Sequence, residues 1–399
     1  MDLIPHDSAF AVNIFALNNT GTLCYLNSLI QALASCPSFV KKVLDNEDEF
    51  ELAKDKLGVK LLELFNRHLK QSPNIIYNKI KVDSTEAILR DLQSARKAGG
   101  HADSLGINTQ EDVFEGMKLM IESLGEILTS PNTKQVSHEF QDIFSVRYKL
   151  IIRCSACGSK RNVDADLCPS DITINMSESN PLLQKNLTTR EQIEQYILLH
   201  MQYPDDYKCE KCSVKNTATE HKIQQFYTLA RVSSVICMSF HDNQHILFQN
   251  ATKRTHTARN VRYFPQELNI NSRSGILRYR IVAQIEQSGV LGGGHYTAKC
   301  LRPRPPGFSE LRLSTARTAL REAEAYLINC HNEERRVLYG NKIANARKVI
   351  EEETNFNKLP DNAFEKQYAT FKFNDGIVTY DPYGIQPSAN TYLIFYHLF

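Results

Sequence analysis

Cys24 is the residue of this sequence with the clearest potential for nucleophilic chemistry. It begins a stretch with the apolar spacing of one helix face, formed by Leu26, Leu29, Ile30 and Leu33. Gly21 indicates a turn before this helix, and Pro37 indicates its end. A thiol in the first helical turn lies at the positive end of the helix dipole, which predicts a lowered pKa and a reactive thiolate. The alternative is a small buried apolar residue, the usual fate of a free cysteine.

A nucleophilic thiol needs a base, and the surroundings of His295 suit that role best. The run 279–287 alternates as a strand does, and Gly292, Gly293 and Gly294 then form a flexible turn. His295 is therefore expected at the start of the next strand, at the edge of a cleft. A single histidine is also common as an ordinary surface or core residue, so this pattern alone leaves both interpretations open.

The third member of such a catalytic group orients the imidazole and is usually an Asn or Asp. Asn374 and Asp375 offer both side chains, at the end of a strand-like run and just before Gly376. Taken alone, Asn-Asp-Gly is simply a turn signal.

Four of the ten cysteines form two Cys-x-x-Cys pairs, Cys154 with Cys157 and Cys209 with Cys212. Each pair presents two thiolates from one turn, and two pairs complete a tetrahedral zinc site with no open position for catalysis. The sequence therefore predicts one structural Zn²⁺ on a long extension, against the alternative of four unrelated reduced thiols. A nucleic-acid-binding ribbon fits less well, because neither pair lies in a notably basic or aromatic segment.

The elements that must position these residues change type along the chain. Helical spacing dominates from residue 24 to about 130, and a period of two from about residue 146 indicates strands, so we expect an α+β fold. Helices are expected over 49–69, 84–95 and 110–128, and strands over 145–153, 232–240, 278–287, 368–373, 376–380 and 391–398.

Ordinary composition and a net charge of +2 argue against a dedicated nucleic-acid or membrane protein. With no membrane span or signal sequence apparent, we expect an intracellular protein, cytoplasmic or nuclear.

Residues 301–357 interrupt the strand pattern with a segment rich in Ala, Arg, Glu and Leu. Residues 301–350 contain ten Lys or Arg and five Asp or Glu, an excess of five positive charges. The segment is predicted to be either a solvated helical hairpin inserted between two strands or a docking surface for an acidic partner.

Together these segments resemble the ubiquitin-specific protease family, the papain-like cysteine isopeptidases that remove ubiquitin from proteins. The resemblance covers nearly the whole chain. The matching residues are Leu17, Asn19, Gly21, Cys24–Ser28 and Gln31 around the thiol, Gly293–Ala298 around the histidine, Phe373–Asp375 with Val378, Tyr392–Tyr396, the four paired cysteines, and Gln110, Asp112 and Glu115.

The resemblance implies a papain-like cysteine protease fold with a helical thumb, an antiparallel β palm and zinc-tipped β fingers. A single catalytic domain over 1–399 is expected. Its expected parts are a thumb at 15–140, fingers at 141–225, a palm at 226–300 and 366–399, and a helical insertion at 301–365.

The resemblance also implies roles for single residues. Cys24 would be the nucleophile, His295 the general base, Asn374 or Asp375 the orienting residue, and Asn19 a donor to the oxyanion. The tail of ubiquitin, Leu-Arg-Gly-Gly, would be bound by Gln110, Asp112, Gly293, Gly294 and Tyr296, with Asp112 facing the tail arginine.

These implications predict a deubiquitinating thiol hydrolase whose partners are ubiquitin or ubiquitinated proteins and a protein bound at 301–357. A monomer that binds neither nucleic acid nor membrane is expected. Two alternatives remain open, namely an inactive ubiquitin-binding scaffold, if Thr22-Leu23 misplaces the thiolate, and a protease specific for a ubiquitin-like modifier.

Overall fold

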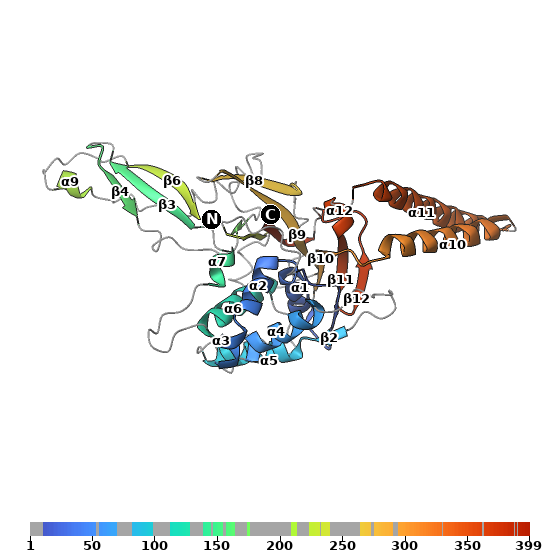
Figure 1. Cartoon of the computed structure of the whole chain (residues 1–399), viewed down its shortest axis with the longest axis horizontal. Helices are drawn as coiled ribbons and strands as arrows, with labels where there is room; N and C mark the ends of the chain where they lie inside the picture. Colours follow the sequence, from blue (N-terminus) through green and yellow to red (C-terminus); the bar gives the residue numbers. More distant parts are fainter. Residues whose placement is uncertain are drawn as a thin grey trace.

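The computed structural model shows an elongated molecule with a mixed helix and sheet centre and a projection at each end (Figure 1). It describes residues 11–52, 56–69, 82–98, 112–127, 139–144, 147–154, 157–163, 174–175, 209–213, 223–231, 233–239, 264–272, 275–289, 294–328, 330–360, 363–386, 388 and 390–399. The α+β expectation is confirmed, since helices precede most of the strands along the chain.

The N-terminal half forms a group of helices around the buried helix α1, all ten residues of which are buried. The helices are α1 (Cys24–Leu33), α2 (Pro37–Asp45), α3 (Glu47–Leu52), α4 (Lys56–Leu69), α5 (Glu86–Ala98), α6 (Val113–Ile127) and α7 (Gln141–Phe144). Helix α1 ends at Leu33, before Pro37 as expected, and Pro37 also begins α2, because the first helical position needs no N–H donor. The helix expected over 49–69 is two helices, α3 and α4.

Two three-residue strands lie beside these helices and were not predicted. β1 (Ala16–Asn18) pairs in parallel with β2 (Val82–Ser84). Strands this short carry no readable alternation, which is why the sequence pattern missed them. Their pairing fixes the chain just before Cys24 against the segment that leads into α5.

The centre of the molecule is an eight-stranded sheet in the order β12-β11-β10-β9-β13-β7-β5, with β8 paired to β9. Its strands are β5 (Ile174–Asn175), β7 (Val235–Ser239), β8 (Glu267–Ser272), β9 (Gly275–Ser288), β10 (His295–Pro303), β11 (Tyr368–Asn374), β12 (Ile377–Tyr380) and β13 (Thr391–Leu398). Helix α1 packs against β10, the strand that begins at His295.

The register of β10 and β11 decides which residues meet at the edge of the sheet. The two strands are antiparallel, with Ala298 opposite Phe373 at one end and Pro303 opposite Tyr368 at the other. The first residue of β10 and the last residue of β11 are therefore at the same end. His295 and Asn374 are brought together in this way across a long separation in sequence.

One projection is a three-stranded sheet in the order β4-β3-β6, at the left of Figure 1. It consists of β3 (Arg147–Cys154), β4 (Lys160–Val163) and β6 (Ile223–Arg231), and the short helix α9 (Glu210–Ser213) lies near its tip. Cys154 ends β3, and the other three paired cysteines lie in or beside the turns at this tip.

The opposite projection is an antiparallel helical hairpin of α10 (Phe308–Ile328) and α11 (Glu333–Asn357), which confirms the expected hairpin (Figure 1). It joins the ends of β10 and β11 that lie away from His295; α12 (Phe364–Gln367) then leads into β11. The hairpin itself carries eight Lys or Arg and eight Asp or Glu, so it has no net charge. The positive excess counted over 301–350 has two sources. That range includes Arg302 and Arg304, which lie in or just after β10 and not in the hairpin, and it leaves out Glu351–Glu353 of α11.

A buried carboxylate joins the two helices at the base of the hairpin, and an aromatic contact attaches that base to the sheet. Glu353 is 2% exposed; it accepts a hydrogen bond from Ser309 Oγ at 2.6 Å and pairs with Arg312. The Phe308 ring packs edge-on against Tyr380 of β12, with ring centroids 5.2 Å apart. The hairpin therefore extends from the sheet as a firmly attached arm.

Among the described residues, no helix has both the length and the apolar character needed to cross a membrane. The boundaries given above for thumb, fingers, palm and insertion stay predictions.

Candidate active site and metal centre

The Cys24 thiol belongs to the first residue of α1, which is 4% exposed. Burial raises its pKa above the ordinary value of 9.0, main-chain hydrogen bonds from Tyr296 and Tyr25 lower it, and the negative charge of Asp375 raises it. The net direction is upward, so the expected lowered pKa was wrong. The physical reason is that loss of hydration and a nearby carboxylate outweigh the helix dipole.

His295 makes a hydrogen bond that leaves one ring nitrogen suited to accept a proton. Its Nε2 lies 2.6 Å from Asn374 Oδ1. An amide oxygen only accepts, so Nε2 carries the hydrogen and donates it, and Nδ1 keeps its lone pair. Asp375 Oδ2 is 3.9 Å from the same Nε2, beyond hydrogen-bond distance. Of the two residues suggested as orienting groups, Asn374 is the one in contact with the imidazole.

Asp375 instead connects this edge of the sheet to the segment around the thiol. Its Oδ1 accepts from Asn27 Nδ2 at 2.8 Å and its Oδ2 accepts from Asn19 Nδ2 at 3.0 Å. Its backbone has φ of +50°, a left-handed conformation that Asp and Asn tolerate better than most residues. The turn after β11 therefore aims this carboxylate at α1 and the loop before it.

The orientation of the Asn19 amide is fixed from both sides. Its Oδ1 accepts from the main-chain N–H groups of Gly21 and Leu23, each at 3.1 Å, and its Nδ2 donates to Asp375. The amide thus shapes the turn that leads into α1, and its nitrogen stays a donor. A second hydrogen on Nδ2 gives it the capacity to stabilise an oxyanion.

Asn27 belongs to the same network and was not singled out as a site residue. It lies one helical turn after Cys24 and is 2% exposed. Besides Asp375, its Nδ2 faces the main-chain oxygen of Asn18 at 3.3 Å, and its Oδ1 accepts from Thr85 Oγ1 at 2.7 Å. An Asn inside an otherwise apolar helix start was the signal that could have identified it, because a buried amide needs partners.

The residues expected to bind a substrate tail are only partly placed by the structure. Gln110 and Gly293 lie outside the described residues, and Gly294 immediately precedes β10. Asp112 caps α6, since its Oδ1 accepts from the N–H of Phe114 at 2.7 Å, and its Oδ2 accepts from the Tyr392 hydroxyl. A role for Asp112 toward a substrate arginine stays a prediction.

Tyr296 is buried between these groups. It is 3% exposed, and its ring lies edge-on to that of Tyr392, with centroids 5.6 Å apart. Burial, followed by the charge of Asp112, holds the pKa of the Tyr296 hydroxyl well above its ordinary value, so this group stays neutral. Tyr392 was noted in the sequence only as part of a motif, and the structure shows that it joins β13 to the start of α6.

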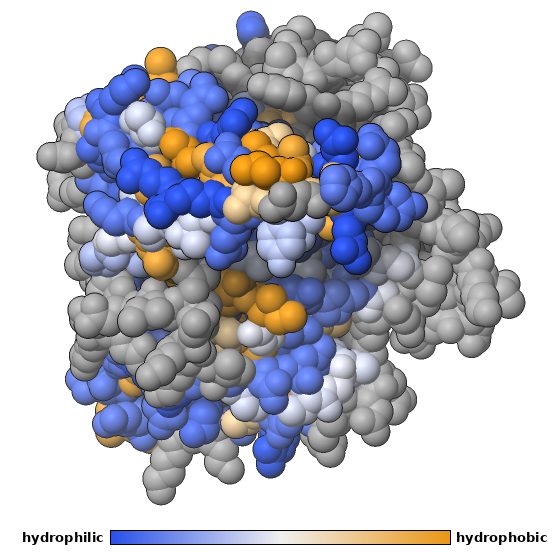
Figure 2. Space-filling view, turned by 90° about the vertical axis from the view of Figure 1, so that its right-hand side faces the viewer, coloured by the Kyte–Doolittle hydropathy of each residue, from blue (hydrophilic) through white to orange (hydrophobic). Residues whose placement is uncertain are grey.

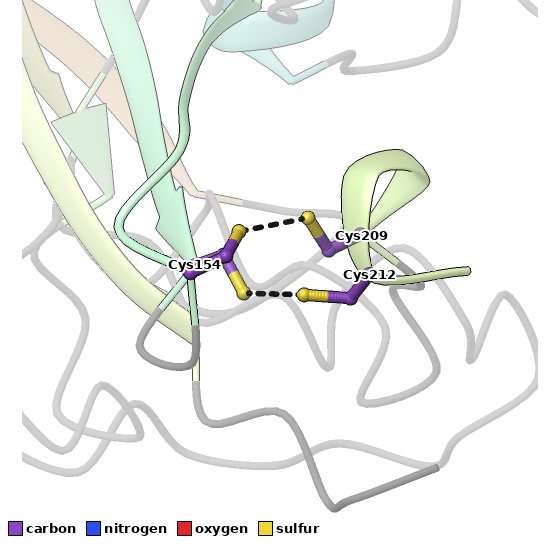
Figure 3. A group of neighbouring side chains, drawn as sticks. Cys154, Cys209 and Cys212 are labelled. Carbon is purple, nitrogen blue, oxygen red and sulfur yellow. Dashed lines mark hydrogen bonds between the residues drawn. The ribbon is translucent and has the colours of Figure 1, made fainter. Parts of the chain in front are cut away.

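The four paired cysteines converge at the tip of the β4-β3-β6 sheet (Figure 3). All four sulfur atoms lie within 4.8 Å of one another. Cys154 Sγ is 3.8 Å from Cys212 Sγ, and Cys157 Sγ is 3.7 Å from Cys209 Sγ. A tetrahedral ion with metal–sulfur bonds of about 2.3 Å would separate its ligands by about 3.8 Å, so the donor set and the spacing fit a bound metal ion.

Comparisons with known proteins agree with this arrangement. The family model described as ubiquitin carboxyl-terminal hydrolase matches residues 15–319. No curated protein matches the chain.

The solved structures that resemble the chain share its fold at low sequence identity. A structure of the SAGA DUB module Ubp8/Sgf11/Sus1/Sgf73 with a substituted Ubp8, bound to monoubiquitin, matches with a TM-score of 0.53 and 14% identity, over 98% of this chain and 70% of the other. The module bound to ubiquitin aldehyde matches with a TM-score of 0.54 and 14% identity, over 97% and 70%. A third structure, in which Ubp8 is substituted and Sgf11 is shortened, gives 0.55 and 15%, over 97% and 69%.

These matches establish the papain-like α+β fold expected for the chain. The matched modules contain several subunits, which gives no support to the expectation of a monomer. Since the family model covers more than half of the sequence, this chain belongs to the ubiquitin carboxyl-terminal hydrolase family, and it is a deubiquitinating hydrolase.

Proposed function

We propose that the chain hydrolyses the bond after the C-terminal glycine of ubiquitin by thiol catalysis, with Cys24 as nucleophile and His295 as base. The observation that carries this proposal is the 2.6 Å contact between His295 Nε2 and Asn374 Oδ1, which leaves Nδ1 free of its proton. The main chain of Tyr296, the next residue, hydrogen-bonds to the Cys24 thiol. The base and the nucleophile therefore lie on adjoining parts of two packed elements.

The reaction begins with a neutral thiol, because burial holds the pKa of Cys24 high. Transfer of its proton to His295 Nδ1 accompanies attack of the sulfur on the glycyl carbonyl carbon. The imidazolium then gives the proton to the departing amine, which leaves a thioester. Water, deprotonated by His295, hydrolyses the thioester and releases the glycine carboxylate and the free thiol.

The tetrahedral intermediates carry a negative oxygen, and Asn19 is the donor we assign to it. The Asn19 amide is held by Gly21, Leu23 and Asp375, so it needs no rearrangement when charge develops. A preorganised donor of this kind typically contributes about 100- to 1000-fold in rate.

For the metal site we propose one structural Zn²⁺, held by Cys154, Cys157, Cys209 and Cys212. Four thiolates fill a tetrahedral coordination shell, so the ion would join β3 to the segment of α9 and take no part in hydrolysis.

For the helical hairpin we propose binding of a protein partner. Its tip exposes Tyr326, Ile328, Val337 and Leu338, each more than half accessible. Figure 2 shows this apolar group surrounded by hydrophilic residues at the end of the arm. Eight residue steps of β10, about 26 Å, separate His295 from the end of the strand where the arm begins. The arm is therefore better placed to hold a partner than to line the reaction site.

Ubiquitin carrying a C-terminal electrophile tests the proposed chemistry. We expect a covalent adduct with the wild-type chain and none with Cys24→Ala, while Cys330→Ala, at a half-exposed thiol of the hairpin, reacts normally. Ubiquitin binding without an adduct would instead support an inactive scaffold, for which the buried thiol with its raised pKa is the favourable observation. A ubiquitin-like modifier bearing the same electrophile, tested in parallel, decides between the two substrate classes.

The cytoplasmic or nuclear location expected from the sequence stays a prediction.

A further inference from the structure

Arg302 is a fully buried cation that the proposed chemistry does not use. It lies on β10 and is 1% exposed. Alternation along the strand places it on the same face as Tyr296, Ala298 and Cys300, all of them buried toward α1. Among the described residues, no carboxylate forms an ion pair with it. A buried charge without a counter-ion is costly, so its retention needs a specific reason.

The partners of Arg302 are at the C-terminal end of α1. Its Nη2 donates to both the main-chain oxygen and Oε1 of Gln31, each at 2.8 Å, and its Nη1 donates to Ser35 Oγ. Helix α1 ends at Leu33 and has no basic residue of its own in the last turn. The guanidinium thus supplies the positive charge and the donors that the carbonyl end of a helix attracts.

Two aromatic rings and one further hydrogen bond complete the enclosure. The guanidinium carbon is 5.1 Å from the centroid of Phe373 and 6.0 Å from that of Phe15. Gln31 Nε2 donates to the main-chain oxygen of Phe15 at 2.9 Å, just before β1. One buried cluster therefore joins α1, β10 and the segment that leads to Asn19.

The reacting groups occupy the other ends of the same two elements. Cys24 begins α1 and His295 begins β10, and each lies seven residues before its partner in the buried cluster, Gln31 and Arg302 respectively. Apolar packing is non-directional, whereas the forked donors of arginine must meet Gln31 and Ser35 in a defined geometry. A shift of about 1 Å in reacting atoms can lower a rate by about 100-fold.

We infer that Arg302 is a positioning residue, which sets the position of α1 along β10 and so places the Cys24 thiol opposite His295. It touches neither substrate nor thiol. The inference rests on the proposed roles of Cys24 and His295.

Arg302→Gln, Arg302→Lys and a control, Arg304→Gln, test the inference in the full chain. Arg304 follows the same strand and lies against the Phe356 ring of the hairpin, so its change perturbs the end of β10 without touching α1. For Arg302→Gln we expect kcat on a fluorogenic ubiquitin C-terminal amide to fall by about 30- to 100-fold, with KM within about threefold of wild type. Arg302→Lys restores the charge near the Gln31 carbonyl but not the forked donors, so its kcat should stay at least about threefold below that of wild type.

Peptide-resolved alkylation of Cys24 by iodoacetamide gives a second readout that needs no ubiquitin. Displacement of α1 weakens the hydrogen bond from the Tyr296 main chain, so alkylation of Arg302→Gln at about pH 8 should be slower than in wild type and in Arg304→Gln. If the wild-type chain alkylates but hydrolyses nothing, the proposed function fails while the alkylation comparison still decides the role of Arg302.

A purely structural role would give a different pattern. Equal losses in Arg302→Gln and Arg304→Gln, a wild-type kcat in Arg302→Lys, or a normal kcat per folded molecule of Arg302→Gln would each overturn the inference. Should Arg302→Gln fail to fold, Ser35→Ala removes one partner of the guanidinium and keeps its charge buried. In that variant a drop in kcat of about threefold or more with unchanged KM supports the inference, and an unchanged kcat refutes it.

Discussion

Asp375→Asn should destabilise the protein strongly, although it replaces one side chain by another of the same shape. The Asp375 carboxylate accepts from two amide nitrogens, Asn27 Nδ2 and Asn19 Nδ2. An asparagine at position 375 tolerates the left-handed backbone equally well. However, it offers one oxygen and one NH2 group, so one of the two facing donors meets another donor.

Neither facing amide can turn round to relieve this conflict. Flipping Asn19 would break its bonds from the N–H groups of Gly21 and Leu23, and flipping Asn27 would turn its Oδ1 toward the main-chain oxygen of Asn18, which can only accept. A lost hydrogen bond to a charged acceptor costs about 1.5–3 kcal/mol, and a buried donor left without a partner costs about 1–3 kcal/mol. We therefore expect the free energy of unfolding to fall by about 3–5 kcal/mol.

Urea denaturation followed by far-ultraviolet circular dichroism measures this change, with two variants for comparison. Asp381→Asn makes the same chemical change at a carboxylate 3.2 Å from Lys299, but there the amide oxygen can still accept from the Tyr383 N–H and Lys299 keeps Glu286 at 3.9 Å, so we expect a loss of about 1 kcal/mol. Asn374→Ala removes an exposed side chain, so it should lower kcat by about 100-fold or more with little loss of stability. A destabilisation of Asp375→Asn no larger than that of Asp381→Asn would refute the assignment of Asp375 as the link between sheet and helix.

Three further results are expected. Alkylation of Cys24 in the free protein should rise only above pH 9, since burial raises the pKa of the thiol above its unfolded-state value of 9.0. The folded protein keeps a proton that the unfolded chain releases from pH 9.0 upward, so the contribution of this thiol to stability is present below pH 9.0 and is lost as pH rises through the folded-state pKa. An alkylation midpoint below about pH 7, measured by peptide mass spectrometry, would contradict the raised pKa. Gly116→Ala should lower stability by about 1–3 kcal/mol in thermal unfolding, because the added carbon would lie 3.2 Å from the Tyr25 ring next to the nucleophile, whereas Gly340→Ala, in open space on α11, should be neutral or stabilising. Metal analysis should find about one zinc per chain, lost in Cys154→Ser and kept in Cys330→Ser; zinc retained in Cys154→Ser would refute the four-thiolate site.

The sequence predicted those parts of the molecule that depend on local pattern. Strand β13 was expected over the residues where it lies, and the two Cys-x-x-Cys pairs were expected to converge. Both predictions follow from the spacing of residues, because alternation of apolar and polar residues specifies a half-buried strand and two Cys-x-x-Cys pairs specify a tetrahedral set of four thiolates. Elements too short to show a pattern, such as the three-residue strands β1 and β2, were not predicted.

The electrostatics of the thiol could not be predicted in the same way. A helix start predicts a lowered pKa for Cys24, but burial raises this pKa, and the Asp375 charge adds to the effect of burial. Both causes arise from contacts between distant segments, which local spacing does not contain. The burial of Arg302 could not be predicted for the same reason. An arginine in a strand is normally expected at the surface, and here its burial depends on the packing of α1 against β10.

The turn after β11 unites these observations. Asn-Asp-Gly was read both as an ordinary turn and as the source of an orienting residue, and the structure makes the two interpretations one. The left-handed turn at Asp375 lets consecutive side chains point to different partners, Asn374 toward His295 and Asp375 toward Asn19 and Asn27. A strand continued past Asn374 would place neighbouring side chains on opposite faces of the sheet, and the carboxylate would then face away from α1. The turn is therefore the local feature that connects the base to the segment carrying the nucleophile.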